Sequence, residues 1–192
     1  MRLLIADDEA VIRMGLRAML EDAGHQVVGA ATNGRSAVVL SEIEKPDLIL
    51  MDIKMPELDG LQAARQIMDK RPTPIVMLTA YSQRELVERA KAASVFAYLV
   101  KPVKEDMLEP TLQLAVLRFR QWKMLRQEAQ DLQASLVARD QVEQAKRVLM
   151  EREGLSEKEA FLKIRHQSRA RRATMEKTAQ AILRKTAATP SR

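Results

Sequence analysis

Apolar and polar positions alternate in two different rhythms along residues 1–120. Some segments are short, uniformly apolar runs, as expected for strands buried on both faces. The others, including one over residues 82–94, carry apolar residues at spacings of three and four, which is typical of amphipathic helices. The five strand-like runs are RLLIA, QVVGAA, DLILMD, PIVMLTA and AYLVKP. Because a helix-like segment follows each run, the pattern predicts an α/β domain with a doubly wound five-stranded parallel sheet.

The strand signal ends near residue 111, and a longer helical pattern begins. Its apolar positions step by three and four residues, as do the a and d positions of a coiled coil. They are Trp122, Leu125, Ala129, Leu132 and Leu136. The seam is about two heptads long, which fits both a coiled coil and an amphipathic helix packed on its own domain. We therefore expect a helical linker over 111–140, with both arrangements open.

Three short helices are predicted in the C-terminal part of the chain. The first, RDQVEQAKRVLMERE, is followed by Gly154, where a helix commonly ends. Ser156 and Glu159 have the spacing of a capping box and predict the start of the second helix. The segment TMEKTAQAILRK predicts the third. Residues 186–192 are expected to be a flexible tail.

The positive charge of the chain is concentrated at its C-terminal end. The formal net charge is +6, yet residues 160–192 contain nine Lys and Arg against one acidic residue, Glu176. A basic terminal segment of this kind indicates a polyanionic partner, although a solvated basic tail has the same composition.

Composition excludes several classes of protein. The chain has no cysteine, so it has no disulfide framework and no thiol nucleophile. No apolar run approaches the roughly 20 residues of a membrane span, and the N-terminus turns acidic too early for a signal peptide. These features predict a cytoplasmic protein without a membrane partner.

Several polar residues are predicted at the carboxyl ends of the strands, where doubly wound sheets bind their ligands. They are Asp7, Asp8, Asp52, Thr79 and Lys101. Crowded carboxylates favour a hard cation, and Mg²⁺ fits this donor set. Asp52 ends a buried strand and is the best-placed nucleophile, because a metal ion and Lys101 can together stabilise charge that develops on a transferring phosphoryl group. Lys101 can neutralise a phosphoryl oxygen and Thr79 can donate a hydrogen bond to one.

The motifs ADDE, LILMDIKMPELDG, MLTA and AYLVKP, in this order and spacing, resemble the receiver domain of two-component response regulators. The resemblance covers residues 1–120 and implies a flavodoxin-like fold. It implies that Asp52 accepts a phosphoryl group from a sensor histidine kinase. It also implies that Thr79 and Tyr98 are the switch pair, that Lys101 contacts the phosphate, and that Pro102 follows a cis peptide bond. The implied Mg²⁺ ligands are Asp7, Asp8, Asp52 and the backbone carbonyl of Lys54.

Phosphorylation would act on the switch pair through charge and space. A phosphoryl group adds up to about two negative charges and three acceptor oxygens. Thr79 would move inward to donate to one oxygen, and the Tyr98 ring would turn into the vacated space. We expect the face at residues 83–103 to change shape. The receiver is expected to catalyse only its own phosphoryl transfer and dephosphorylation.

The segment QAKRVLMEREGLSEKEAFLKIRHQSR, with the trailing AQAIL, resembles the ANTAR domain of transcription antitermination regulators. The resemblance covers residues 128–185 and implies binding to RNA hairpins in leader transcripts. The candidate RNA-binding residues are Lys146, Arg147, Arg152, Lys163, Arg165, Arg169, Arg171, Arg172 and Lys177. We further expect a phosphorylation-dependent homodimer. Its dimerisation arm would consist of Trp122, Leu125, Leu132 and Leu136.

Two other outputs remain open at the level of sequence. The segment LSEKEAFLKIRHQS has the character of the opening of a helix-turn-helix domain, which would bind DNA. A helical tail that only docks on a protein partner is the second alternative. An output enzyme is not expected, because residues 120–192 contain one histidine, no cysteine and no glycine-rich phosphate loop.

Overall fold

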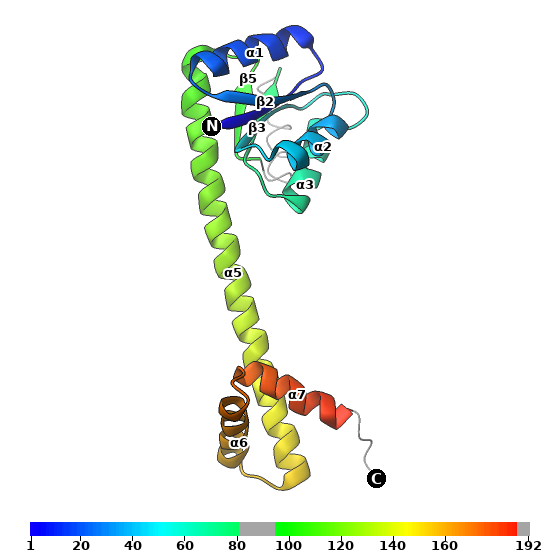
Figure 1. The fold of residues 1–192 in the computed structure, drawn as a ribbon, viewed down its shortest axis with the longest axis vertical. Helices are drawn as coiled ribbons and strands as arrows, with labels where there is room; N and C mark the ends of the chain where they lie inside the picture. The colour runs from blue at the N-terminus through cyan, green and yellow to red at the C-terminus, as the bar shows by residue number, and fades with distance from the viewer. Residues whose placement is uncertain (81–94, 188–192) are drawn as a thin grey trace. The chain divides into compact units, whose positions relative to one another are not determined.

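The computed structural model describes residues 1–80 and 95–187, which form parts of two compact units, Met1–Lys123 and Met124–Arg192. The first unit contains a five-stranded, all-parallel sheet in the order β2-β1-β3-β4-β5 (Figure 1). Its strands are β1 (Arg2–Ala6), β2 (Gln26–Ala31), β3 (Leu48–Asp52), β4 (Ile75–Thr79) and β5 (Ala97–Val100). The predicted doubly wound sheet is thus confirmed.

Helices cover both faces of this sheet. The helices between the strands are α1 (Ala10–Asp22), α2 (Gly34–Glu44) and α3 (Gly60–Lys70). α2 and α3 lie side by side, and right-handed crossovers place α1 on the opposite face (Figure 1). Every position of β3 and β4 is buried, as the uniformly apolar runs predicted. The helix predicted over 82–94, and with it most of the predicted switch face, lies outside the described residues.

The last helix of the first unit continues into the second. Helix α5 runs from Glu105 to Glu153, and its buried Leu108, Leu112 and Ala115 belong to the core of the first unit. The prediction of a separate short helix beginning at residue 139 was therefore wrong. Residues 111–153 contain neither glycine nor proline, so nothing in the backbone interrupts the helix.

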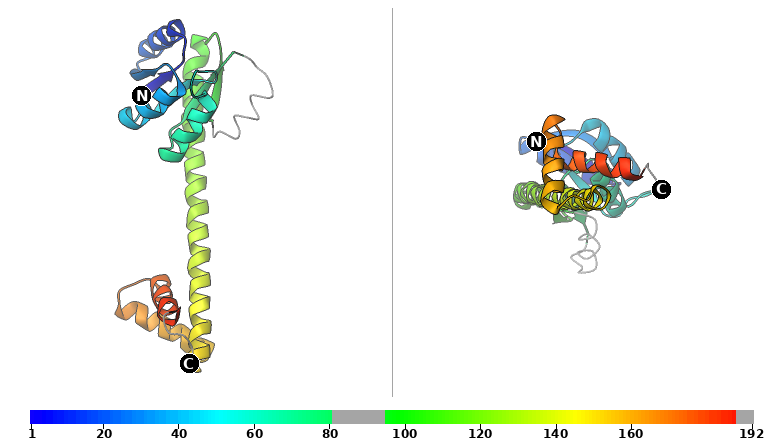
Figure 2. Two further views of the ribbon diagram at one scale, coloured as in Figure 1. Left: turned by 90° about the vertical axis from the view of Figure 1, so that its right-hand side faces the viewer. Right: turned by 90° about the horizontal axis from the view of Figure 1, so that it is seen from below.

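The second unit is a small three-helix arrangement. The last turns of α5 pack with α6 (Glu157–Ala170) and α7 (Met175–Ala187), as both views in Figure 2 show. Its core is built from small and branched side chains, chiefly Ala145, Leu149, Ala160, Ile164 and Ala179. The predicted capping box is present, because Ser156 accepts from the backbone of Glu159 and Glu159 accepts in return.

The ends of these helices carry two left-handed residues. Gly154 has a φ of 65° and its N–H donates to the carbonyl of Met150, which ends α5 as predicted. Arg172 has a φ of 49° just beyond α6, at a position that glycine commonly occupies. α7 extends to Ala187, so the predicted tail does not begin at 186. Within residues 1–80 and 95–187, no helix combines the length and apolar character needed to cross a bilayer.

Candidate functional site

The predicted pocket residues meet at the carboxyl edge of the sheet. The Lys101 ammonium lies 2.7 Å from Asp7 Oδ2 and 3.0 Å from Asp52 Oδ2, so one cation bridges two carboxylates. Asp8, Lys54 and Thr79 line the same cavity, which has a volume of about 270 Å³. Strands β1, β3 and β4 end beside one another in the sheet, which explains why residues so far apart in sequence converge.

Burial sets the electrostatics of this pocket. The Asp7 side chain is fully buried and that of Asp52 is 10% exposed. Burial raises the pKa of the Asp52 carboxyl above its usual value, and the neighbouring Lys101 opposes this shift only in part. Burial alone would lower the pKa of Lys101, but its contacts with Asp7 and Asp52 outweigh it and raise that pKa. The lysine therefore stays charged beside a carboxylate that is costly to ionise.

Two residues that sequence reasoning missed hold the backbone of the site. Arg13 donates to the backbone carbonyls of Asp7 at 2.7 Å and Asp8 at 2.9 Å. Gly60 packs so closely under β3 that a Cβ built on it would lie 1.9 Å from the Asp52 carbonyl oxygen. The close approach of Gly60 to β3 leaves no local signal in the sequence, and an arginine in the first turn of α1 resembles any solvated side chain.

The donor set fits a hard divalent cation. Carboxylate oxygens of Asp7, Asp8 and Asp52 all lie within 4.8 Å of one another. Asp7 Oδ2 is buried and has no hydrogen-bond donor in good geometry among the described residues, although the Lys101 ammonium contacts it as an ion pair. An all-oxygen set with open positions suits Mg²⁺, which keeps several water ligands. Lys54 lines the same cavity, where its carbonyl was predicted to contribute.

The two predicted switch residues lie on neighbouring strands. Thr79 is buried at the end of β4, and Tyr98 is half-buried on β5, packed against the core. Thr79 pairs in register with Val100, and Tyr98 with Met77 two residues earlier. Burial raises the pKa of the Tyr98 phenol, which keeps it neutral. The Lys101–Pro102 peptide bond is cis, as the resemblance implied.

Lys146 was predicted to bind RNA, but the structure removes it from the set of candidate RNA-binding residues. Its side chain is only 8% exposed, and its ammonium pairs with Glu143 at 2.9 Å and Glu157 at 2.7 Å. These contacts raise the pKa of Lys146 and lower that of Glu157. Lys146 therefore joins α5 to the first turn of α6 and is not available as a phosphate contact.

The other predicted RNA-binding cations lie at the surface of the second unit. Lys163 pairs with Glu153, whereas most of the remainder are exposed arginines. They come from α5, from α6, from the connection between α6 and α7, and from the first turn of α7. The exposed set comprises Arg147, Arg152, Arg165, Arg169, Arg171, Arg172 and Lys177.

The predicted dimerisation arm divides into two parts. Trp122 stacks on Phe119 with ring centroids 5.7 Å apart and lies 6.0 Å from the buried Phe96. It is therefore packed against the core of the first unit, which corrects its assignment to the arm. Leu125, Leu132 and Leu136 are between 60% and 66% exposed. These three leucines, named here the leucine seam, are a large apolar surface open to solvent.

Comparison with known proteins defines the class to which this chain belongs. The family model of the response regulator receiver domain matches residues 3–113, and that of the ANTAR domain matches residues 122–183. The chain therefore belongs to the response regulator family, with a receiver domain followed by an ANTAR domain. Both resemblances drawn from the sequence are thus confirmed.

Individual relatives agree with this assignment. The transcriptional regulatory protein PdtaR of Mycobacterium tuberculosis is 48% identical over 182 residues, covering 95% of this chain and 89% of that protein. The chemotaxis protein CheY of Thermotoga maritima is 42% identical over 112 residues, 58% of this chain and 93% of CheY. Among solved structures, the receiver domain of a modulated diguanylate cyclase from Desulfovibrio desulfuricans G20 is 32% identical. It has a TM-score of 0.58 over 62% of this chain and 95% of that domain.

Proposed function

We propose that phosphorylation of Asp52 by a sensor histidine kinase controls the binding of the ANTAR domain to RNA hairpins, and thereby transcription antitermination. The observation that carries the first half is the placement of Asp52 at the end of buried β3, with the Lys101 ammonium 3.0 Å from its oxygen. The second half rests on the ANTAR match and on the excess of cations in residues 160–192. We place this activity in the cytoplasm.

The pocket residues account for phosphoryl transfer to Asp52. An Asp52 carboxylate oxygen attacks the phosphorus of a phosphorylated kinase histidine, and the P–N bond breaks with its electron pair retained by the imidazole. Lys101 exchanges its contact with Asp52 for a phosphoryl oxygen, where it offsets the added negative charge. A Mg²⁺ ion held by Asp7, Asp8, Asp52 and the Lys54 carbonyl would supply further positive charge. The chain catalyses no reaction beyond this transfer and the later hydrolysis.

The switch pair links the phosphoryl group to the rest of the receiver. Thr79 lines the pocket where phosphoryl oxygens would lie, and a hydroxyl there can donate a hydrogen bond to one of them. Tyr98 remains a neutral phenol because burial raises its pKa, so an inward turn of the ring avoids the much larger cost of burying a charge. A partner surface that favours the altered face shifts the population of the two states.

RNA binding is supported by the surface of the ANTAR domain. Exposed arginines and lysines contact phosphates and splayed bases in single-stranded loops, which is how most sequence-specific RNA recognition works. The leucine seam provides the apolar surface for a homodimer, and two domains would suit two hairpins. The name of the relative PdtaR describes a transcriptional regulator, in agreement with an output on transcription.

A competition experiment tests this function. Protein activated with a phosphoryl mimic is titrated with a labelled RNA of paired hairpins and with duplex DNA of equal charge, at two salt concentrations. We expect a preference for the hairpin RNA that persists at the higher salt, since non-specific phosphate contacts weaken steeply with salt. The Asp52→Asn variant is the control and should neither accept the phosphoryl group nor respond to the kinase.

Other results would replace the proposal. Salt-resistant preference for duplex DNA would identify a DNA-binding output. Equal and salt-sensitive binding to both nucleic acids would leave a helical tail that acts on a protein partner. Labelling of Asp52→Asn by the kinase would show that another residue accepts the phosphoryl group.

A further inference from the structure

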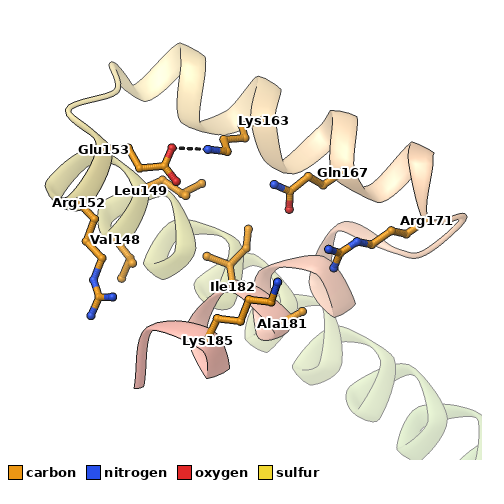
Figure 3. A pocket seen from close by; sticks show the side chains of 10 residues that line it. All are labelled: Val148, Leu149, Arg152, Glu153, Lys163, Gln167, Arg171, Ala181, Ile182 and Lys185. Carbon is orange, nitrogen blue, oxygen red and sulfur yellow. Dashed lines mark hydrogen bonds and ion pairs between the residues drawn. The ribbon is translucent and has the colours of Figure 1, made fainter. Parts of the chain in front are cut away.

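A cavity of about 250 Å³ opens where α5, α6 and α7 meet in the ANTAR domain (Figure 3). Val148, Leu149 and Ile182 form its apolar part. Gln167 extends from α6 and Arg171 from the end of that helix towards α7, and Lys185 extends from α7 beside Ile182 (Figure 3). Typical sites for drug-sized ligands have volumes of about 300–1,000 Å³, so this cavity suits a single ring system.

The rim of the cavity has an excess of positive charge. Four cations line it, Arg152, Lys163, Arg171 and Lys185, against one carboxylate, Glu153. Glu153 is already paired with Lys163. Among the residues that the structure describes, no carboxylate pairs with the Arg171 guanidinium. The Arg171 guanidinium therefore favours a ligand that carries negative charge next to its apolar portion.

The Gln167 side chain can form hydrogen bonds with the polar edge of a ligand. A side-chain amide offers donors and an acceptor at once, which matches the mixed edge of a nucleobase. In the described part of the chain, no protein group hydrogen-bonds the Gln167 side chain. The amide therefore faces the cavity with its hydrogen-bonding capacity unused.

We propose that this cavity binds one unstacked nucleobase of an RNA loop, with Gln167 contacting its edge and Arg171 and Lys185 contacting the flanking phosphates. The apolar floor covers the face of the base, a role that aromatic side chains fill in many RNA-binding proteins. Aromatic residues are scarce here: Phe161 is the sole aromatic residue after Trp122, and it is absent from the cavity lining. The inference rests on the proposed RNA-binding function and identifies where specificity would reside.

The test begins with an RNA selected by the protein itself. The activated full-length chain selects hairpins from a pool with randomised loops, and each loop position of the winner is replaced in turn by an abasic nucleotide. We expect one position at which base removal weakens binding by roughly tenfold or more, in line with the loss of one buried base. In the Gln167→Ala variant this penalty should shrink severalfold, because the edge of the base loses its contact while the apolar floor still covers its face.

Two matched variants separate base recognition from charge. Arg171→Gln, just beyond α6, and Arg165→Gln, inside α6, each remove one positive charge, but of the two only Arg171 lines the cavity. Arg165→Gln should weaken intact and abasic hairpins by the same factor, whereas Arg171→Gln should also reduce the difference between them. A second selection with Gln167→Glu should enrich a different base at the sensitive position. Thermal unfolding of each variant confirms that it is folded, and alanine is well tolerated in a helix.

The outcomes distinguish this inference from the proposed function. If Gln167→Ala retains the full penalty for base removal, the base is read elsewhere and the cavity assignment is wrong, while RNA binding stands. If the wild-type protein enriches no hairpin from the pool, the proposed function fails and the cavity assignment fails with it.

Discussion

At the residue scale, Asp52 carries a conflict between stability and chemistry. Its carboxylate must be ionised to attack phosphorus, yet it is largely buried and lies near the carboxylate of Asp7. Lys101 offsets this only in part, so the folded protein holds the carboxyl at a raised pKa. Reactivity at this position therefore comes at the expense of folding free energy.

The Asp52→Asn variant should be more stable than the wild type at neutral pH. Removing a buried charge that the fold disfavours raises the free energy of unfolding. Because the pKa of Asp52 is raised in the folded state, the wild-type protein gains stability as the pH falls through that folded-state pKa. The advantage of Asp52→Asn should therefore be largest at neutral pH and vanish below about 3.8, the ordinary value for the group. Urea unfolding across this range measures the difference, and a variant less stable at pH 7 would contradict the account.

Gly60 should tolerate no side chain. A methyl group there would collide with the Asp52 carbonyl, so Gly60→Ala should lower the free energy of unfolding by about 2 kcal/mol or more. Gly15→Ala is the matched control, because a Cβ at Gly15 meets nothing within 4 Å and the residue lies inside α1. That substitution should stabilise the protein by about 0.5–1 kcal/mol. Denaturant titration measures the free energy of unfolding of both variants. If Gly60→Ala raised it as Gly15→Ala does, β3 would have to be able to move away from residue 60.

At the element scale, the positions of the strands and the residues of the pocket could be predicted from the sequence. The side chains against which the helical residues pack could not. The five strands follow from uniformly apolar runs, and strand order alone brings Asp7, Asp52 and Lys101 together. The burial of Lys146 could not be predicted, because it depends on Glu143 and Glu157 meeting across two helices. Trp122 has the spacing of the a and d positions of a seam, but its ring packs against Phe96 and Phe119. Local spacing identifies which side of a helix is apolar without specifying what covers it.

Lys146 and Arg147 provide a direct comparison of a structural and a surface cation. Lys146→Met should lower the unfolding temperature of the ANTAR domain, because it removes the link from α5 to the start of α6. Since Lys146 lowers the pKa of Glu157, its contribution is present above the ordinary value of 4.5 and is lost as the pH falls below it. Calorimetry at several pH values should show the difference between variant and wild type shrinking in acid.

Arg147→Met should behave in the opposite way. Its side chain is exposed on α5, so stability should change little while RNA affinity falls and the salt dependence weakens. Stronger loss of RNA binding in folded Lys146→Met than in Arg147→Met would overturn the reassignment of Lys146.

At the scale of the whole molecule, the leucine seam should convert phosphorylation into assembly. Sedimentation velocity with a phosphoryl mimic should show a dimer for the wild type. Replacing Leu125, Leu132 and Leu136 by serine should weaken it on the order of a hundredfold or more, because each leucine buries substantial apolar surface. Met124→Ser is the control, since Met124 is 72% exposed but off the seam. A dimer unaffected by the triple substitution would place the interface elsewhere.

The left-handed backbone at Arg172 bears on how this protein would respond to selection. A non-glycine residue in that conformation costs about 1 kcal/mol or more, so glycine at this position should be favoured in any screen for heat resistance alone. The same change deletes a surface guanidinium that we expect to contact RNA. Selection for thermal stability should therefore favour glycine at position 172, whereas selection for regulation should retain arginine. A variant evolved for thermal stability alone would be more stable but would bind RNA more weakly.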